Sequence, residues 1–338
     1  MEAHDLSGGG DVLARVTRFA ERAVSAYGCR PGTSIRLLNV SENATFLIEG
    51  ADGGRSVLRV HRLGYHTERE IASELAWMEA LRAEAGVRTP RVLPAADGRR
   101  VVTMADPSGG PDRSCVRFEF LPGTEPVPDA VEHFAELGEI TARMHRHVRD
   151  WAPPPWFTRF HWDHPAAFGG QARWGRWQDG LGLGASEREI LARLEAALAA
   201  RLAGFGAGPE RYGLIHADTR LANLLIADGA VSVIDFDDCG FSWYLYDLGT
   251  SVSFFEHEPQ VPELIDSWLN GYRRVRSLPA GDEAEIWTFI LYRRLLLVAW
   301  IGSHQGAQIA QELGARYTRD SCELAERYLS GRCRVAGP

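Results

Sequence analysis

The sequence changes character at Leu121-Pro122-Gly123, and this change limits the folds open to the chain. Before it, short β-branched or apolar runs alternate with turn residues, most clearly at Ala51-Asp52-Gly53-Gly54, as expected for antiparallel strands joined by hairpins. After it, long segments carry apolar residues at helical spacing. The pattern predicts an α+β protein in which a small β-rich lobe precedes a larger, mainly helical lobe.

The same periodicities give approximate element ranges. In the first part we expect helices over 11–27 and 67–85, and strands over 35–38, 45–49, 56–60, 91–93, 101–104 and 116–121. In the second part we expect helices over 130–147, 187–202, 261–276, 283–303 and 308–329, and two strands over 224–226 and 232–235. Residues 1–118 should therefore form the N-terminal lobe, 119–123 a hinge and 124–338 the C-terminal lobe.

The charge of the chain is unevenly distributed. The formal net charge is −8, and because residues 1–123 are balanced, the whole acidic excess lies in 124–338. A nucleic-acid partner is not expected, because binding a phosphate backbone requires a basic face. The simpler explanation of this negative charge is solubility. The more specific hypothesis is that it marks a site that attracts a metal and a cationic substrate.

Cysteine usage and hydropathy predict a cytoplasmic protein without a membrane span. The five cysteines are scattered and contain no CxxC pair, which argues against a disulfide framework or a zinc site. The N-terminal residues show no signal-peptide pattern. The most apolar stretch, 286–301, is interrupted by Arg293 and Arg294 and is shorter than the roughly 20 residues of a membrane span. We expect a buried core helix there.

The strongest chemical signal is a set of oxygen-bearing side chains in the C-terminal half. Asp218 and Asn223 lie five residues apart in HADTRLAN, and Asp235 follows in VIDFDD beyond a turn at 227–230. Phosphoryl transfer needs a carboxylate for the attacking hydroxyl, oxygen ligands for Mg²⁺ and cationic groups on the phosphates. Three such side chains in otherwise apolar segments would be costly without a metal. The pattern predicts a phosphotransferase site, with Asp235 on the second strand.

The segments HADTRLANLLI, VIDFDD and YDLG, in this order, resemble the signature of the aminoglycoside phosphotransferase and choline kinase family, a relative of protein kinases. The resemblance extends over residues 35–330, and FDDCGFSWYLYDLG and YRRLLLVAWIGSH are most similar to its homoserine-kinase-like group. It implies a bilobal protein-kinase-like fold. It also implies an enzyme that moves the γ-phosphate of ATP to a hydroxyl of a small molecule, with ATP and Mg²⁺ as cofactors.

The resemblance assigns roles to five residues of the motif. Asp218 would be the catalytic base or the carboxylate that orients the hydroxyl. Asn223 and Asp235 would hold Mg²⁺. His216 would brace the loop through hydrogen bonds, and Asp247 would anchor the loop from beneath.

The acceptor side of the site is less defined by the sequence. One of the two acids Asp237 and Asp238 could bind a substrate or a second metal ion, and capping a loop is an equal alternative. Tryptophans crowd the region that would lie near the acceptor: Trp151, Trp156, Trp162, Trp174 and Trp177. They could bind a cationic amine by cation–π contacts, although packing of the helical lobe is the simpler interpretation.

The N-terminal lobe supplies the predicted phosphate contact. Arg59, in the run 57–60, occupies the place where protein kinases use a lysine, and all 37 basic residues of this chain are arginine. Arginine can bind phosphate through two parallel hydrogen bonds. Its partner should be Glu74 on the following helix, with Glu70 as a competitor one turn earlier.

Nucleotide contacts are predicted at two further places. Ser41 and Asn43 lie between two predicted strands, where a loop covering the phosphates belongs, although GxGxxG is absent. The adenine should lie at the hinge, against the backbone of Glu119 and Leu121. These positions and Arg59 form the predicted ATP site.

Two alternatives to a small-molecule kinase remain open. A protein Ser/Thr kinase of the stress-response type shares the fold, but only about a dozen residues separate Asp235 from Asp247, too few for a usual peptide-docking segment. A nucleotide-binding pseudokinase would have lost a base or metal ligand, and none is lost. The sequence does not identify the acceptor, which could be an amino alcohol, a hydroxy amino acid, an aminoglycoside or a related natural product.

Overall fold

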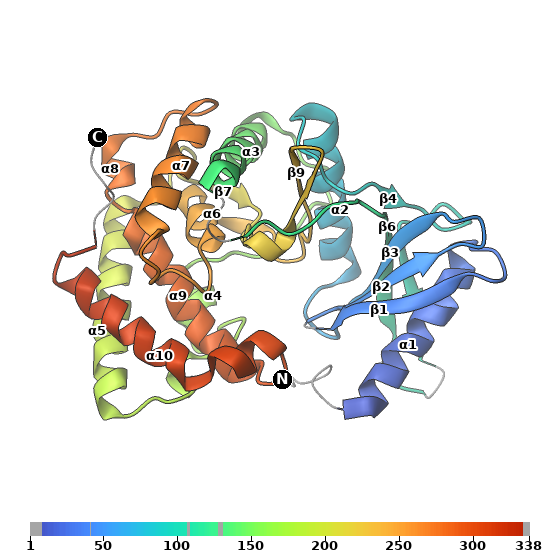
Figure 1. Cartoon of the computed structure of the whole chain (residues 1–338), viewed down its shortest axis with the longest axis horizontal. Coiled ribbons are helices and arrows are strands. Elements are labelled where there is room, and N and C mark those ends of the chain that lie inside the picture. Colours follow the sequence, from blue (N-terminus) through green and yellow to red (C-terminus); the bar gives the residue numbers. More distant parts are fainter. Residues whose placement is uncertain (1–8, 41, 107–108, 128–130, 334–338) are drawn as a thin grey trace.

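The computed structural model describes residues 9–40, 42–106, 109–127 and 131–333. An antiparallel sheet forms the N-terminal part and helices form the C-terminal part (Figure 1). The strands of the sheet are β1 (Ser34–Val40), β2 (Ala44–Glu49), β3 (Arg55–Val60), β4 (Val92–Leu93), β5 (Val101–Met104) and β6 (Arg113–Glu119). Their order is β1-β2-β3-β6-β4, with β5 also paired to β6. All six predicted strands are present.

Two helices cover the sheet through separate cores. Helix α1 (Gly9–Ala26) packs its buried face against β2, β3 and β6, in a cluster that includes Phe19, Phe46 and Leu58. Helix α2 (Glu68–Glu84) belongs to the other core cluster, which continues into the helical part. A capping box at Thr67 fixes its first turn. The helix is therefore tied to both parts of the molecule.

The C-terminal part is built around one buried helix, α9 (Ile286–Ser303). The other helices are α3 (Val131–Asp150), α4 (His164–Phe168), α5 (Ala185–Phe205), α6 (Tyr244–Ser251), α7 (Val261–Arg273), α8 (Ala280–Glu283) and α10 (Gln308–Leu329), with 3₁₀ turns η1 (Trp177–Asp179) and η2 (Leu221–Asn223). Among the described residues, the stretch Ala280–Ser303 is long and apolar enough to cross a membrane, but 89% of its most apolar window is buried inside the protein. It is a core helix, as predicted.

Two small ladders carry the predicted motif. Strands β8 (Leu224–Ala227) and β9 (Ala230–Val233) form the expected hairpin. Strands β7 (Tyr212–Ile215) and β10 (Gly240–Trp243) pair on either side of it in the sequence and were not predicted. The prediction that Asp235 lies on a strand was wrong. Strand β9 ends at Val233, and Asp235 has a φ of 59°, which no strand can accommodate.

Other predicted elements differ in detail. The helix expected over 283–303 begins three residues later, as α9, because its capping residue Glu285 has a non-helical backbone, and the short α8 precedes it. Helix α10 has its predicted bounds but is kinked at Gly314, where φ is 48°. All five cysteines are free thiols, as expected.

Helices α3 and α7 approach each other at two glycines. A Cβ atom at Gly271 would lie 1.7 Å from the carbonyl oxygen of Ala135, and one at Gly138 would lie 2.0 Å from the carbonyl oxygen of Trp268. Because both obstacles are backbone atoms, side-chain rotation cannot relieve the overlap. The two helices pack backbone to backbone beneath the site-bearing loops.

We predict that Gly271→Ala lowers the free energy of unfolding by about 1–3 kcal/mol, the usual cost of overpacking a tightly packed core. Gly281→Ala is the matched control, because nothing lies within 4 Å of the added Cβ. The control should leave stability unchanged or raise it. Urea unfolding of the three proteins measures the difference, and equal midpoints would show that α3 and α7 are not in close contact.

Candidate active site

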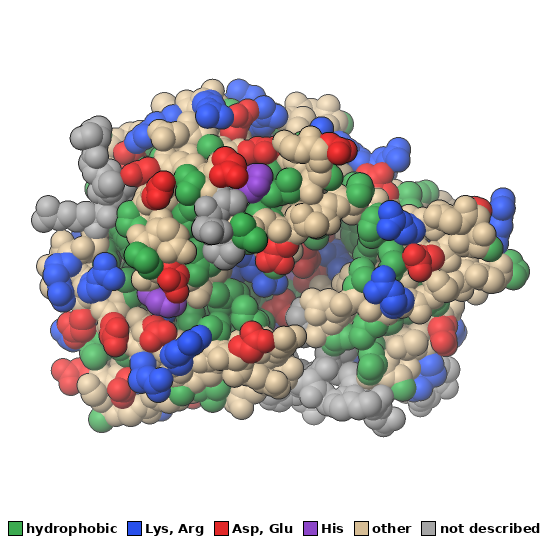
Figure 2. All heavy atoms as spheres, viewed as in Figure 1, with side chains coloured by type: hydrophobic (Ala, Val, Ile, Leu, Met, Phe, Trp, Pro, Cys, Tyr) green, Lys and Arg blue, Asp and Glu red, His purple; other side chains and the backbone are tan. Residues whose placement is uncertain are grey.

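A cleft of about 370 Å³ separates the sheet from the helical part. Figure 2 shows acidic and basic side chains gathered in the hollow between the two parts. Seven residues predicted from the sequence line this cleft: Asn43, Arg59, Glu74, Glu119, Leu121, Asn223 and Asp235. Segments more than 150 residues apart in the sequence thus meet at one place.

The loop after β7 is held by the buried carboxylate of Asp247. Ala217 has a φ of 65°, a left-handed conformation that is costly for a residue with a side chain. Its amide donates to Asp247 Oδ1 at 2.7 Å, and the amide of His216 donates to Oδ2 at 3.3 Å. His145 Nε2 lies 2.9 Å from the same Oδ2. These bonds stabilise the turn, which matches the anchoring role predicted for Asp247.

His216 joins the two halves of the motif. Its Nδ1 accepts the amide hydrogen of Asp218 at 3.2 Å, so the proton of a neutral ring must be on Nε2, which donates to the carbonyl of Ile234 at 3.1 Å. Burial lowers the pKa of His216, which keeps the ring neutral. The geometry fits the predicted bracing role and leaves no ring nitrogen for acid–base chemistry.

Asp218 is fixed through both of its carboxylate oxygens. Oδ1 accepts from Arg293 Nη2 at 2.5 Å, and Oδ2 accepts from Asn223 Nδ2 at 2.6 Å and from Arg220 Nε at 3.2 Å. Burial opposes ionisation, but the charges of Arg220 and Arg293 outweigh it and hold the pKa of Asp218 below its ordinary value. Asp218 is therefore an ionised carboxylate in a defined orientation.

Arg293 is a residue of the site that the motif alone did not reveal. It comes from α9, is 2% exposed, and also donates to the carbonyl of Ala217 at 3.3 Å and to the hydroxyl of Tyr246 at 3.3 Å. A signal was present in the sequence, because an arginine inside an apolar helix needs a buried partner. The sequence could not identify that partner as Asp218.

Arg59 lies between the two parts of the molecule. Its Nη2 donates to both carboxylate oxygens of Glu74 at 2.7 Å, and its Nη1 donates to Asp235 Oδ1 at 3.2 Å. The competitor Glu70 instead accepts from the amide and hydroxyl of Thr67. Glu74 is thus the acid that meets Arg59.

Asp235 lies at the cleft beside Arg59. Desolvation by the cleft walls raises its pKa to about 7, Arg59 opposes the shift, and the carboxylates of Asp237 and Asp218 add to it. The side chain is nevertheless 45% exposed, so the walls of the cleft and not close packing cause the desolvation. A cation bound there would favour the charged form.

The pair Asn223 and Asp235 suits a hard divalent cation. The amide nitrogen of Asn223 is committed to Asp218, to its carbonyl oxygen at 2.8 Å and to its carboxylate, which leaves the amide oxygen as the group available for a ligand. No cluster of three or more His, Cys, Asp or Glu that could hold a metal occurs in the described ranges. Two protein oxygens are enough for Mg²⁺ when phosphates and waters complete its coordination.

The remaining predicted nucleotide contacts are only partly described. Asn43 uses its side-chain oxygen to accept the amide hydrogen of Arg62 at 3.0 Å, and Ser41 lies outside the described residues. The amide of Glu119 donates to the carbonyl of Arg91 at 2.9 Å, so it is not available to a nucleotide. Leu121 lines the cleft beyond the end of β6.

The predicted tryptophans mostly pack the core. Trp162, Trp174 and Trp177 are buried, Trp151 is half-buried, and Trp156 is 44% exposed. Packing of the helical lobe, the simpler of the two interpretations, thus explains the three buried tryptophans. Trp174 differs in position, because its ring lies 4.9 Å from the guanidinium carbon of Arg293.

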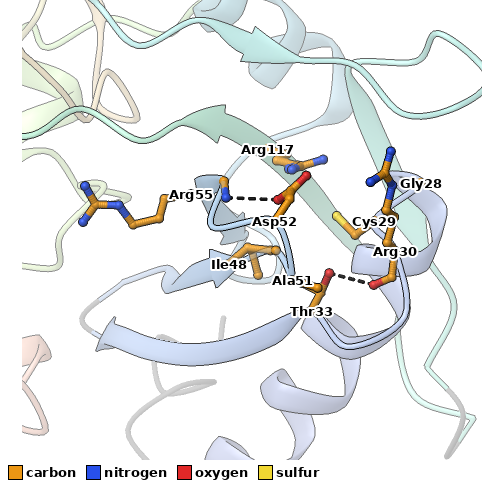
Figure 3. Close-up of a pocket in the computed structure, with 11 residues that line it drawn as sticks. Gly28, Cys29, Arg30, Thr33, Ile48, Ala51, Asp52, Arg55 and Arg117 are labelled. Atoms are coloured by element: carbon orange, nitrogen blue, oxygen red, sulfur yellow. Dashed lines mark hydrogen bonds between the residues drawn. The ribbon is translucent and has the colours of Figure 1, made fainter.

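A second pocket lies far from the motif, between the turn after α1 and the β2–β3 hairpin (Figure 3). Its volume is about 260 Å³. Its polar groups bond to one another or to nearby protein groups, as in the bond from Thr33 to the carbonyl of Arg30 at 2.7 Å, from the Gly54 amide to Asp52 at 3.0 Å and from Arg117 Nε to the hydroxyl of Ser56 at 2.9 Å. It contains none of the predicted site residues.

The chain is similar to known phosphotransferases in both sequence and structure. The sequence pattern of the phosphotransferase enzyme family matches residues 34–283. The solved structure of a microcompartment-associated aminopropanol kinase is 47% identical, has a TM-score of 0.88, and aligns over 95% of this chain and 100% of that one. An amicoumacin kinase, solved with AMP-PNP, Ca²⁺ and Ami, is 20% identical with a TM-score of 0.75 over 94% of this chain and 96% of its own. A homoserine kinase of Rhodopseudomonas palustris (strain TIE-1) is 26% identical over 81% of this chain and 84% of its own length.

We predict that His145 makes the stability of the protein fall in mild acid. Burial lowers the pKa of His145 against the opposing effect of Asp247, so the folded protein keeps the ring neutral. The unfolded chain takes up a proton below pH 6.5, and it then binds more protons than the folded state. The unfolding free energy should therefore fall as pH falls, by up to about 1.4 kcal/mol for this residue between pH 7.5 and 5.5.

Urea unfolding at the two pH values tests this prediction. In His145→Gln, which keeps a hydrogen-bond donor for Asp247, the loss between pH 7.5 and 5.5 should be smaller than in the unaltered protein by that amount. His133→Gln on the same helix is the matched control. An unchanged loss in His145→Gln would contradict the assignment of a buried neutral ring.

Proposed function

We propose that this chain, which belongs to the phosphotransferase enzyme family, transfers the γ-phosphate of ATP to the hydroxyl of a small amino alcohol. Phosphate transfer to a small-molecule hydroxyl is the activity that its kinase relatives share. The amino-alcohol acceptor rests on the whole-length similarity, at 47% identity, to an aminopropanol kinase. The observation that carries the reaction is the fixed, ionised Asp218 beside a cleft with a cationic side and an oxygen-rich side.

The cleft has the groups that an ATP-dependent phosphotransferase requires. Arg59, held by Glu74, would contact the phosphates of ATP, and the adenine would lie near Leu121 in the hinge 119–123. Asn223 and Asp235 would hold Mg²⁺. When bound, Mg²⁺ supplies positive charge to the phosphate oxygens that gain negative charge during transfer.

Asp218 would act on the acceptor hydroxyl. The hydroxyl donates its hydrogen bond to the carboxylate, which directs an oxygen lone pair at the γ-phosphorus. As the new oxygen–phosphorus bond forms, the bond to ADP breaks and the hydroxyl proton passes to Asp218. Because the pKa of Asp218 is low, its main contribution is orientation, in keeping with a loose transition state that needs little base assistance.

The two alternative functions have less support. The residues between Asp237 and Thr250 are buried apart from half-buried Phe241, which leaves no exposed segment there for docking a peptide. The base, the metal ligands and the phosphate arginine of the motif are all present, which argues against a pseudokinase. Five free thiols fit a reducing cytoplasm, which we propose as the location.

Release of ADP from Mg·ATP, measured with a panel of hydroxyl compounds, tests this proposal. The panel should contain aminopropanol, ethanolamine, homoserine, an aminoglycoside, a diol and a generic protein substrate. We expect turnover with the short amino alcohols, loss of turnover in EDTA and recovery with added Mg²⁺. Turnover only with another class would disprove the amino-alcohol acceptor, and turnover only with the protein would favour the protein-kinase alternative.

A further inference from the structure

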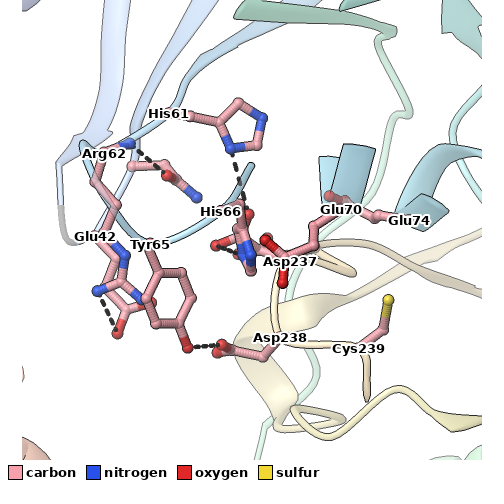
Figure 4. A network of polar contacts seen from close by, with 12 residues as sticks. Glu42, His61, Arg62, Tyr65, His66, Glu70, Glu74, Asp237, Asp238 and Cys239 are labelled. Atoms are coloured by element: carbon pink, nitrogen blue, oxygen red, sulfur yellow. Dashed lines mark hydrogen bonds and ion pairs between the residues drawn. The ribbon is translucent and has the colours of Figure 1, made fainter. Parts of the chain in front are cut away.

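The adjacent acids Asp237 and Asp238 have opposite surroundings (Figure 4). Asp237 lies among cations and imidazoles, with Arg59 Nη1 at 3.9 Å, His61 Nδ1 at 3.5 Å and His66 Nε2 at 3.4 Å. Burial opposes its ionisation, but these neighbours outweigh it and hold the pKa of Asp237 well below its usual range. The charge of Asp237 is therefore balanced within the protein.

Asp238 has no such balance. It is 5% exposed, and its Oδ1 accepts a hydrogen bond from the neutral hydroxyl of Tyr65 at 2.6 Å. In the described part of the chain, no cationic side chain forms an ion pair with it, and its Oδ2 has no hydrogen-bond partner. Burial, together with the charges of Glu42, Asp237 and Asp218, raises the pKa of Asp238 well above its ordinary value, and the charge of Arg62 opposes the shift only in part.

Arg62, whose charge acts on Asp238, is already engaged elsewhere. Arg62 stacks its guanidinium on the ring of Tyr65, 3.3 Å from the ring centroid, and reaches Glu42 at 3.7 Å. Glu42 in turn accepts a hydrogen bond from Trp300 Nε1 at 2.7 Å. Glu42 therefore adds negative potential near Asp238 without supplying a counter-charge.

Asp238 is linked to Asp218 by a short series of contacts. The hydroxyl of Tyr65 that donates to Asp238 accepts a bond from Trp174 Nε1 at 3.2 Å. The ring of Trp174 lies 4.9 Å from the guanidinium carbon of Arg293, which donates to Asp218 at 2.5 Å. The two carboxylates are thus close enough to interact by charge.

We propose that Asp238 binds the ammonium group of the acceptor while Asp218 orients its hydroxyl. This inference rests on the proposed function, because it requires an acceptor that carries both groups. A buried carboxylate without a cationic partner is costly, and a bound ammonium removes that cost by forming a charge-assisted hydrogen bond.

The arrangement selects for an amine as well as a hydroxyl. A diol of the same length could still reach Asp218, but its neutral hydroxyl would not supply the positive charge that pairs with an ionised Asp238. Discrimination of this kind is strong, because the penalty falls on a buried polar group of the enzyme. The acceptor class is therefore a short amino alcohol with a protonated amine.

The test compares 1-amino-2-propanol with 1,2-propanediol at saturating Mg·ATP, in the unaltered enzyme and in Asp238→Asn. We expect Asp238→Asn to lower kcat/KM for the amino alcohol on the order of 100-fold, mainly through KM. The kcat/KM for the diol and the KM for Mg·ATP should stay within a few-fold of the unaltered enzyme. The exposed Asp179 on η1 provides the matched control, Asp179→Asn.

A second variant separates recognition from loss of structure. Tyr65→Phe keeps the carboxylate of Asp238 but removes its hydrogen-bond donor, so it should weaken amino-alcohol use less than Asp238→Asn and should spare the diol. Thermal unfolding midpoints show whether each variant is folded. An equal loss with both substrates would overturn the ammonium site and indicate a structural role.

The remaining outcomes distinguish a failure of the ammonium site from a failure of the proposed function. If the unaltered enzyme prefers the amino alcohol and Asp238→Asn keeps that preference, the ammonium site is wrong and the proposed function stands. If the unaltered enzyme phosphorylates another class of hydroxyl compound and not the amino alcohol, the proposed function fails and the ammonium site fails with it.

Discussion

The buried carboxylate of Asp247 holds the arrangement on which the site depends. It accepts the amides of His216 and Ala217 and so stabilises a left-handed turn at an alanine, a conformation that costs of order 1–3 kcal/mol. That turn directs Asp218 toward Arg293 and Asn223. The strain is confined to this turn. Asp247 itself lies on α6, and both α6 and the neighbouring α9 are almost entirely buried, which keeps the carboxylate in place.

Charge balance explains the different roles of the carboxylates around the cleft. Glu74 and Asp237 have cationic or imidazole partners within the protein, and Asp218 is held by two arginines. Asp235 and Asp238 are less completely balanced, and each pKa is raised by desolvation. A divalent cation at Asp235 and an ammonium group at Asp238 would complete the balance when both substrates are bound.

The sequence allowed the architecture and the central motif to be predicted, because both depend on local patterns. Alternating and helical periodicities located the six strands and the long helices, and the spacing of Asp218, Asn223 and Asp235 predicted a site whose residues the structure brings to the same cleft region. What it could not supply were contacts between distant segments. The pairing of β7 with β10 joins two four-residue strands with no local signature, and Arg293 meets Asp218 across 75 residues. The difference between Asp237 and Asp238 likewise depends on side chains from the segment after β3.

We propose that Asp218 mainly orients the acceptor hydroxyl and takes its proton as the new phosphate bond forms, while other residues bind the nucleotide. The most direct measurement compares turnover with Mg·ATP affinity in Asp218→Asn, using the acceptor that the unaltered enzyme prefers. The account predicts that turnover falls by on the order of 100-fold or more, while the Kd for Mg·ATP, measured by calorimetry, stays within a few-fold. Turnover equal to that of the unaltered enzyme would contradict the account.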